Sequence, residues 1–280
     1  MEITHSTQAT SGCNPWLEFA RRFNPELEAA SCTPDQMAQM RADAYNDMQG
    51  NLTGYDCKYC NNRGYIAVVK DGDDIRRECT CMEIRRMLAA ATASGMQELL
   101  HRCKFSNYEE PEQWQKIAKN TAIGYAERSL PNQWFFLCGQ SGSGKTHLAT
   151  ATCGLMIKRH FTVRYEMWRD LLHKLEATKY KLEQQEDIMR ILSDCDVLYI
   201  DDFLKTGKNV QPSDSDISYA YEIINNRYNQ GKRMIISTEF MLDDIARIDE
   251  ALCGRINQMS QKFRIQIAKD AAKNYRNRED

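Results

Sequence analysis

The chain has 280 residues, a formal net charge of −2 and 42% hydrophobic residues, enough for one or two domains with a sizeable core. The near-neutral charge gives no sign of bulk electrostatic binding to nucleic acid, and no apolar run approaches the ~18 residues of a membrane span. Because the first residues lack the basic and apolar regions of a secretion signal, the 11 cysteines favour a reducing compartment over a disulfide scaffold. We therefore expect a cytoplasmic protein with no membrane partner.

Charge is unevenly distributed along the chain. Residues 1–56 hold 3 Lys+Arg against 8 Asp+Glu, whereas residues 57–104 hold 9 against 6 and residues 255–280 hold 7 against 3. Basic middle and end segments favour an anionic partner, although scattered solvated charge would give the same counts. The sequence leaves these two interpretations open.

The N-terminal segment, residues 1–51, is expected to be helical. Met37, Met40, Ala44 and Met48 recur at helical spacing after Pro34. Such a helix would either dock on a partner or pack on its own domain.

Two close pairs of cysteines lie within the next segment, residues 52–82, separated by 18 residues: Cys57, Cys60, Cys79 and Cys81. This spacing matches the ligands of a tetrahedral Cys₄ zinc site. Four unrelated thiols or a redox Cys-x-x-Cys pair are the alternatives, but a redox site would need only one pair. We expect Zn²⁺ here, because a module this small buries too little surface to fold without metal.

The residues between the cysteine pairs predict a hairpin. A strand-like run over 64–69 is followed by a turn at 71–74 and a returning strand over 75–78. Such a hairpin would bring the two pairs together.

The zinc module is followed by an expected linker helix, residues 83–104. The Ala-, Leu- and Arg-rich run from Met82 to Cys103 predicts one continuous helix. After a break at 104–111, helical and strand-like segments alternate to about Ile267. This alternation predicts an α/β domain with a parallel sheet over residues 105–280.

The most specific motif follows a predicted buried strand over 134–138. It matches G-x-x-x-x-G-K-[ST], the phosphate-binding P-loop: Gly139, Gln140, Ser141, Gly142, Ser143, Gly144, Lys145 and Thr146. Glycines allow backbone N–H groups to surround phosphate oxygens, and a helix predicted over 147–160 adds its N-terminus. Lys145 would reach the β- and γ-phosphates, and Thr146 would ligate Mg²⁺. A glycine-rich surface turn is the alternative, but strand, motif and helix in this order favour nucleotide binding.

A second apolar run, 196–200, ends in Asp201 and Asp202. Carboxyl ends of strands carry the ligands in parallel sheets, so Asp201 would hold the Mg²⁺ shell. Asp202 would orient or deprotonate the attacking water. Many P-loop ATPases have Glu at this position, and the shorter Asp predicts slow ATP hydrolysis.

Two later features are weaker. The run 234–239 predicts a buried strand whose end, at Thr238 and Glu239, would contact the γ-phosphate or the water, or would merely enter a loop. Arg255 would either complete a neighbouring subunit's site or remain solvated.

Together these motifs resemble the AAA+ replicative-helicase loaders of the DnaC/DnaI type, especially those of phages and mobile elements, which share an ATPase core with IstB-like transposition helpers. The resemblance covers about residues 52–280. It rests on the cysteine module, the P-loop, the run 197–202 and a set of short segments: 223–228, 235–239, 248–251, 254–256 and 274–276.

The resemblance implies a three-layer αβα ATPase domain that binds ATP and Mg²⁺. Thr238 and Glu239 lie at the sensor-1 position, where many members have Ser-Asn, so Glu239 departs from the family pattern. Arg255 resembles the arginine finger, Arg227 is a second candidate for a subunit contact, and Arg276 is a candidate sensor-2-like or DNA-contacting residue.

The resemblance also implies the partners. The N-terminal part would bind a DnaB-type replicative helicase, and the ATPase domain would bind single-stranded DNA and self-associate. Lysines, arginines and one tyrosine near the end of the chain are compatible with DNA binding: Lys262, Arg264, Lys269, Lys273, Tyr275, Arg276 and Arg278. A transposition helper is the alternative, but such helpers generally lack a zinc module. A nucleotide-binding adaptor with negligible turnover is a third possibility.

Overall fold

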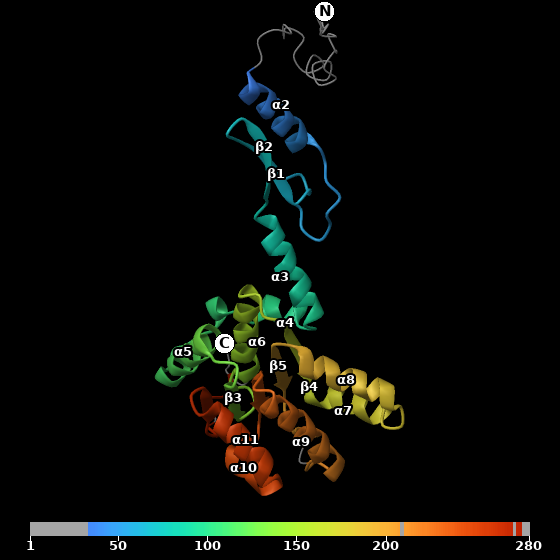
Figure 1. Ribbon diagram of the computed structural model, residues 1–280. Coiled ribbons are helices and arrows are strands. Elements are labelled where there is room, and N and C mark those ends of the chain that lie inside the picture. The colour runs from blue at the N-terminus through green and yellow to red at the C-terminus, as the bar shows by residue number, and fades with distance from the viewer. Residues whose placement is uncertain (1–32, 208–209, 271–272, 276–280) are drawn as a thin grey trace, which may run out of the picture. The chain divides into compact units, whose positions relative to one another are not determined.

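The structure is a computed structural model that describes residues 33–207, 210–270 and 273–275 (Figure 1). Expectations for residues 1–32, Arg276 and Arg278 therefore lie outside the described residues. The chain divides into two compact units, Met1–Arg86 and Met87–Asp280. None of the helices in the described ranges is both long and apolar enough to cross a bilayer.

Among the described residues of the first unit, a helix lies beside a hairpin. Helix α2 (Pro34–Asp47) begins with a capping box, in which Thr33 and Gln36 each accept a hydrogen bond from the other's backbone N–H. Strands β1 (Tyr65–Lys70) and β2 (Asp73–Glu78) pair antiparallel. The turn residues Asp71 and Gly72 both have positive φ, as a two-residue hairpin requires. The predicted hairpin is confirmed.

Helix α2 packs on this hairpin. Its Ala38 and Ala42 are buried, and the Asn46 side chain both donates to the Ala67 carbonyl and accepts from the Ala67 N–H, each at 2.9 Å. The amphipathic stretch therefore packs against its own unit, and binding of a partner by this segment stays a prediction.

The predicted continuous helix from Met82 to Cys103 is wrong. The chain instead forms α3 (Cys81–Ala93) and α4 (Gln97–Arg102), separated at Gly95, whose φ is 76°. A left-handed glycine ends a helix readily, because it carries no Cβ. A 3₁₀ turn, η1 (Phe105–Asn107), follows.

The second unit is built on a five-stranded parallel sheet in the order β4-β5-β6-β3-β7. Its strands are β3 (Trp134–Gly139), β4 (Val163–Met167), β5 (Val197–Asp201), β6 (Arg233–Thr238) and β7 (Arg264–Ile267). The strands over the predicted runs 134–138, 196–200 and 234–239 are thus present, and the predicted α/β fold is confirmed.

Helices cover both faces of the sheet. Alternate residues of β3 belong to different cores: Trp134 and Phe136 face one, Phe135 and Leu137 the other. One core includes residues of α5 (Gln113–Arg128) and α6 (Lys145–Lys158). The other is built with α7 (Trp168–Ala177), α8 (Leu182–Asp194), α9 (Asp214–Asn229), α10 (Leu242–Ile248) and α11 (Glu250–Ser260). The result is three layers, αβα.

This topology brings three sequence motifs to one edge. Strands β5, β6 and β3 are neighbours and run parallel, so their carboxyl ends meet at the same side of the sheet. The P-loop follows β3, Asp202 follows β5 and Glu239 follows β6. Doubly wound sheets bind ligands at such edges.

Candidate nucleotide site and metal centre

The P-loop forms an anion-binding turn between β3 and α6. Gly139, Gly142 and Gly144 have φ values of 124°, 77° and 85°. Only glycine fits at Gly139, because a Cβ there would lie 2.0 Å from the Ile267 carbonyl oxygen of the adjacent strand. Helix α6 begins at Lys145, so its free N–H groups and positive dipole end meet the loop.

Lys145 is almost fully buried and folds back on the loop. Its Nζ donates to the carbonyls of Gly139 and Gln140 at 2.8 and 2.7 Å. Burial lowers the pKa of Lys145, although the nearby carboxylates of Glu239, Asp202 and Asp201 oppose this effect. Because the ammonium of Lys145 is desolvated, it can give up its hydrogen bonds to the loop carbonyls and bind phosphate oxygens instead.

Thr146 and Asp201 meet at the start of α6 and the end of β5. Thr146 Oγ1 donates to Asp201 Oδ1 at 3.1 Å, and the same oxygen accepts from the Ser237 hydroxyl and from the Asp202 N–H. Burial raises the pKa of Asp201, partly offset by these hydrogen bonds. A buried carboxylate beside a hydroxyl is the oxygen donor set that Mg²⁺ prefers, so the residues present fit this ion.

Asp202 and Glu239 border the same space from the next turns. Asp202 has a positive φ of 53°, and its carboxylate lies 3.4 Å from Lys205 Nζ, which also contacts Glu239 Oε1 at 2.7 Å. Glu239 thus sits at the edge predicted for it. The sequence did not predict the pairing of Lys205, because the position of a lysine three residues after Asp202 does not show where its side chain points.

Thr238 differs from its prediction. Its side chain is fully buried, donates to the Phe203 carbonyl at 2.7 Å and accepts from the Phe240 N–H at 3.1 Å. The hydroxyl therefore ties β6 to the turn after β5 and does not line the pocket. The polar group of β6 that meets the predicted magnesium ligands is instead Ser237.

The P-loop, Asp202 and Glu239 line one pocket of about 330 Å³. Three aromatic side chains also line it: Tyr108 and Trp114, which the sequence did not predict, and Tyr275, which it suggested only for DNA binding. Tyr108 Oη is buried without a hydrogen-bond partner among the described residues, which fits a pocket that receives a ligand. The pocket places aromatic surface beside the phosphate-binding turn, as a nucleotide requires.

The segment after β7 is attached to the P-loop. Gln140 Nε2 donates to the Asp270 carbonyl and Gln140 Oε1 accepts from the Asp270 N–H, both at 2.7 Å. The Tyr275 N–H donates to the Gly142 carbonyl at 2.9 Å. Residues 273–275 thereby reach the site, and Lys273 is among the residues that line the pocket.

Arg255 lies on α11 and does not line the pocket of its own chain. Its guanidinium stacks over Tyr221 and Tyr228, with centroid distances of 4.8 and 5.6 Å, and donates to the Tyr221 hydroxyl at 3.0 Å. Two tyrosines of α9 therefore orient this arginine. The role predicted for it, in a neighbouring subunit's site, stays a prediction.

Arg227 does not have the surface position expected of a subunit contact. It is 1% exposed, and its guanidinium donates to backbone carbonyls at the end of α8 and the start of two strands: Leu192, Ser193, Cys195, Asp196 and Arg233. The carbonyls that end a helix lack intrahelical partners, and Arg227 satisfies them. It is a buried structural residue.

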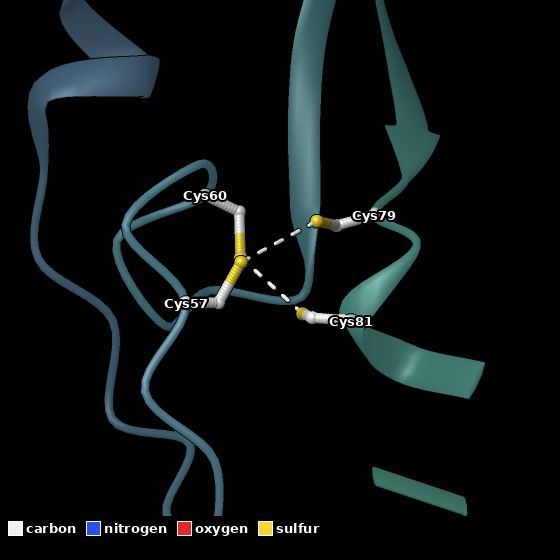
Figure 2. A group of neighbouring side chains, drawn as sticks. All are labelled: Cys57, Cys60, Cys79 and Cys81. Carbon is white, nitrogen blue, oxygen red and sulfur yellow. Dashed lines mark hydrogen bonds between the residues drawn. The ribbon is translucent and has the colours of Figure 1, made fainter. Parts of the chain in front are cut away.

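The four cysteines converge in the first unit (Figure 2). Their sulfur atoms all lie within 4.8 Å of one another, with Cys57–Cys79 at 3.8 Å and Cys60–Cys81 at 3.5 Å. Tetrahedral zinc with ~2.3 Å Zn–S bonds requires sulfur separations of roughly 3.8 Å. The Gly64 N–H also donates to Cys60 Sγ at 3.3 Å, which stabilises a thiolate. The cluster thus fits a zinc ion, and a single redox pair would not explain four converging thiols.

Relatives of known name share this chain's sequence. It is 29% identical over 238 residues to phage-like element PBSX protein XkdC of Bacillus subtilis (strain 168), covering 80% of this chain and 86% of that protein. It is 30% identical over 188 residues to the replicative helicase loader DnaC of Buchnera aphidicola subsp. Schizaphis graminum, covering 66% and 68%.

Solved structures share the fold. The crystal structure of DnaI superposes with a TM-score of 0.50 at 18% identity, covering 62% of this chain and 92% of that one. The replication initiator DnaA bound to AMPPCP and single-stranded DNA also gives a TM-score of 0.50, at 19% identity over 60% of this chain and 50% of that one.

The family model described as IstB-like ATP binding protein matches residues 68–265. This range includes the P-loop, Asp201, Asp202 and Arg255. The match covers more than half of the chain, and the geometry around Lys145 is that of a nucleoside-triphosphate site. The chain therefore belongs to the family of IstB-like ATP-binding proteins, and its relatives include a DnaC helicase loader.

Proposed function

We propose that this protein is an ATP-dependent DNA replication factor that binds a DnaB-type replicative helicase and loads it onto single-stranded DNA. The observation that carries the proposal is the contact between Thr146 and Asp201 beside the pocket of the P-loop, in a chain with relatives named replicative helicase loader DnaC. ATP binding and hydrolysis would act as a switch between states of an assembly.

Each residue of the site would have its own role in ATP binding and hydrolysis. Lys145 and the P-loop amides bind the phosphates, and Thr146 with Asp201 would hold Mg²⁺, which supplies charge neutralisation at the phosphate oxygens. Asp202 orients or deprotonates the water. Its side chain is partly exposed beside Lys205, and its reach is short, so we expect slow turnover.

The parts of the chain would have separate roles. The segment 1–51 and the zinc module 52–82 would bind the helicase, and 83–104 would connect them to the ATPase domain. Residues 105–280 would bind single-stranded DNA and self-associate, with Arg255 completing a neighbour's site. The oriented guanidinium of Arg255, outside its own pocket, supports this last assignment.

ATP turnover with and without single-stranded DNA tests the switch. We expect slow hydrolysis by the wild type, several-fold faster with DNA, and loss of at least two orders of magnitude in Lys145→Ala, because phosphate positioning and charge stabilisation dominate phosphoryl transfer. Equal, near-zero turnover of both proteins, unaffected by DNA, would instead identify a nucleotide-binding adaptor.

A transposition helper is the second candidate, favoured by the IstB-like description of the family. Such a helper would recruit a transposase to target DNA. The converging cysteine cluster supports the loader, because the helpers generally lack a zinc module. Retention of a transposase, and of no replicative helicase, on the immobilised protein would decide for the helper.

A further inference from the structure

The nucleotide pocket contains a second cation that the ATP-binding motifs do not account for. Lys205 Nζ lies 2.7 Å from Glu239 Oε1 and 3.4 Å from Asp202 Oδ2. All three residues line the same pocket as Lys145 and the P-loop. The ion pair therefore borders the phosphate-binding turn.

An unusual turn holds Lys205 in this place. Asp202 and Leu204 both have positive φ, 53° and 64°, a conformation that a branched side chain such as leucine rarely adopts. Phe203 and Leu204 are fully buried, and the Phe203 N–H donates to the Ser237 carbonyl at 2.9 Å. Such strain persists only where packing over-determines the backbone, and it is common at functional sites. Here the turn directs Lys205 toward the ends of β5 and β6.

The charges around Lys205 favour a contact between its ammonium and a bound triphosphate. Asp202 and Glu239 would repel the terminal phosphate if they were unpaired, and the positive charge of Lys205 offsets one of their two negative charges. Burial acts to lower the pKa of Lys205, but the hydrogen bond to Glu239 and the charge of Asp202 raise it above its usual value. An ammonium has three donors, so Lys205 can give one to a phosphate oxygen while keeping its two carboxylate partners.

We propose that Lys205 is a second phosphate-binding residue, which contacts the terminal phosphate of ATP, and that Glu239 is its positioning residue. The inference rests on ATP being the ligand of this pocket. Lys205 comes from the strand end that carries Asp201 and Asp202, the groups assigned to the metal and the water, so it meets the terminal end of the phosphate chain. ADP has no such phosphate, and Lys205 therefore distinguishes ATP from ADP.

Binding of ATP and ADP to the full-length protein, measured by displacement of a fluorescent nucleotide, tests the assignment. We expect Lys205→Met to weaken the binding of ATP roughly tenfold or more, because one charge-assisted hydrogen bond is lost. The binding of ADP should weaken by less than about twofold. Lys205→Arg should restore most of the preference for ATP. Glu239→Gln should reduce the ATP-to-ADP affinity ratio to a value between the wild type and Lys205→Met.

The matched control is Lys174→Met. Lys174 pairs with Glu166 at 2.7 Å, the same distance as the Lys205–Glu239 contact, but it does not line the pocket. The Lys174→Met variant should leave the affinities for ATP and for ADP unchanged. Thermal melting without nucleotide shows whether each variant is folded.

Equal weakening of ATP binding and ADP binding in Lys205→Met, or no change in either affinity, would overturn the assignment. These outcomes are separable from failure of the proposed function. A protein that binds no helicase but keeps a Lys205-dependent ATP-to-ADP ratio would refute the loader and leave this inference standing.

Discussion

Asp201 illustrates the stability cost of burying a carboxylate. Its carboxylate is buried, and burial raises its pKa in the nucleotide-free protein. A raised carboxyl pKa means that the folded state binds the proton more tightly than the unfolded state. The associated stability is present at low pH and is lost as pH rises through the folded-state pKa. At neutral pH the buried carboxylate therefore weakens the domain.

Asp201→Asn should accordingly stabilise the nucleotide-free protein at neutral pH by about 1 kcal/mol, a typical gain when an active-site charge is removed. Oδ1 accepts all three hydrogen bonds from Thr146, Ser237 and Asp202, so the amide oxygen can keep them. The same variant should lose magnesium-dependent ATP binding. Urea unfolding at pH 5 and pH 8 measures the effect, and the gain should be larger at pH 8.

The control is Asp187→Asn, on an exposed carboxylate of α8 that does not line the pocket. It should change the free energy of unfolding by less than about 0.5 kcal/mol. An Asp201→Asn protein that is destabilised at both pH values would contradict the account of a buried, cation-seeking carboxylate.

Arg227→Met should lower the free energy of unfolding by about 3 kcal/mol, because it leaves several buried carbonyls without a donor. Arg247→Met, on an exposed arginine, should change it by less than about 0.5 kcal/mol. Chemical denaturation measures both. A neutral Arg227→Met would restore the prediction of a surface role.

Residues within a local motif were predictable, and residues paired across the fold were not. Lys145, Thr146 and Asp201 follow strands in patterns a few residues long, and the structure brings them together. The Lys205–Glu239 pair joins residues 34 positions apart, and it depends on β5 lying beside β6. The buried position of Arg227 was not predictable either, because its carbonyl partners lie on other elements.

At the scale of elements, close contact between β3 and β7 fixes the start of the P-loop. A Cβ on Gly139 would collide with the Ile267 backbone, whereas one on Gly254 in α11 would meet nothing within 4 Å. Glycine is thus required at one position and costs helix stability at the other.

This contrast gives a paired prediction. Gly139→Ala should destabilise the domain by roughly 3 kcal/mol and abolish nucleotide binding, since the backbone must move. Gly254→Ala should stabilise it by about 0.5–1 kcal/mol. Urea unfolding and nucleotide titration of both variants provide the test, and a tolerated Gly139→Ala would refute the described β3–β7 contact.

The cysteine module is an element whose fold we expect to depend on metal. Its regular structure is mainly a two-stranded hairpin, and such hairpins are marginal in water. Zinc binding of order 10 kcal/mol would supply the missing stability. The sequence predicted the ligands and the hairpin because both are local in the chain.

Chelation should therefore release amide protons of residues 50–80 to rapid exchange while the central sheet stays protected. Cys79→Ser should lose about one zinc per chain, and Cys253→Ser, which lies outside the cluster, should keep it. Metal analysis and hydrogen exchange check these outcomes. Protection that survives metal removal would contradict a zinc-dependent module.

At the scale of the molecule, the chain divides between a unit that carries the cysteine cluster and a unit that carries the ATP pocket. The parallel sheet was predictable from alternating segments, whereas the break at Gly95 was not, because one glycine within an otherwise helical pattern is often tolerated. A partner-binding unit joined to an ATPase is the arrangement that a nucleotide-switched assembly factor requires.

Retention of a purified replicative helicase on the immobilised protein tests this account most directly. The full chain should retain the helicase, whereas residues 87–280, which form one of the two compact units, should bind ATP but retain none. Helicase held equally by the fragment and the full chain, or by neither, would contradict the claim that the protein recruits a helicase through its N-terminal unit.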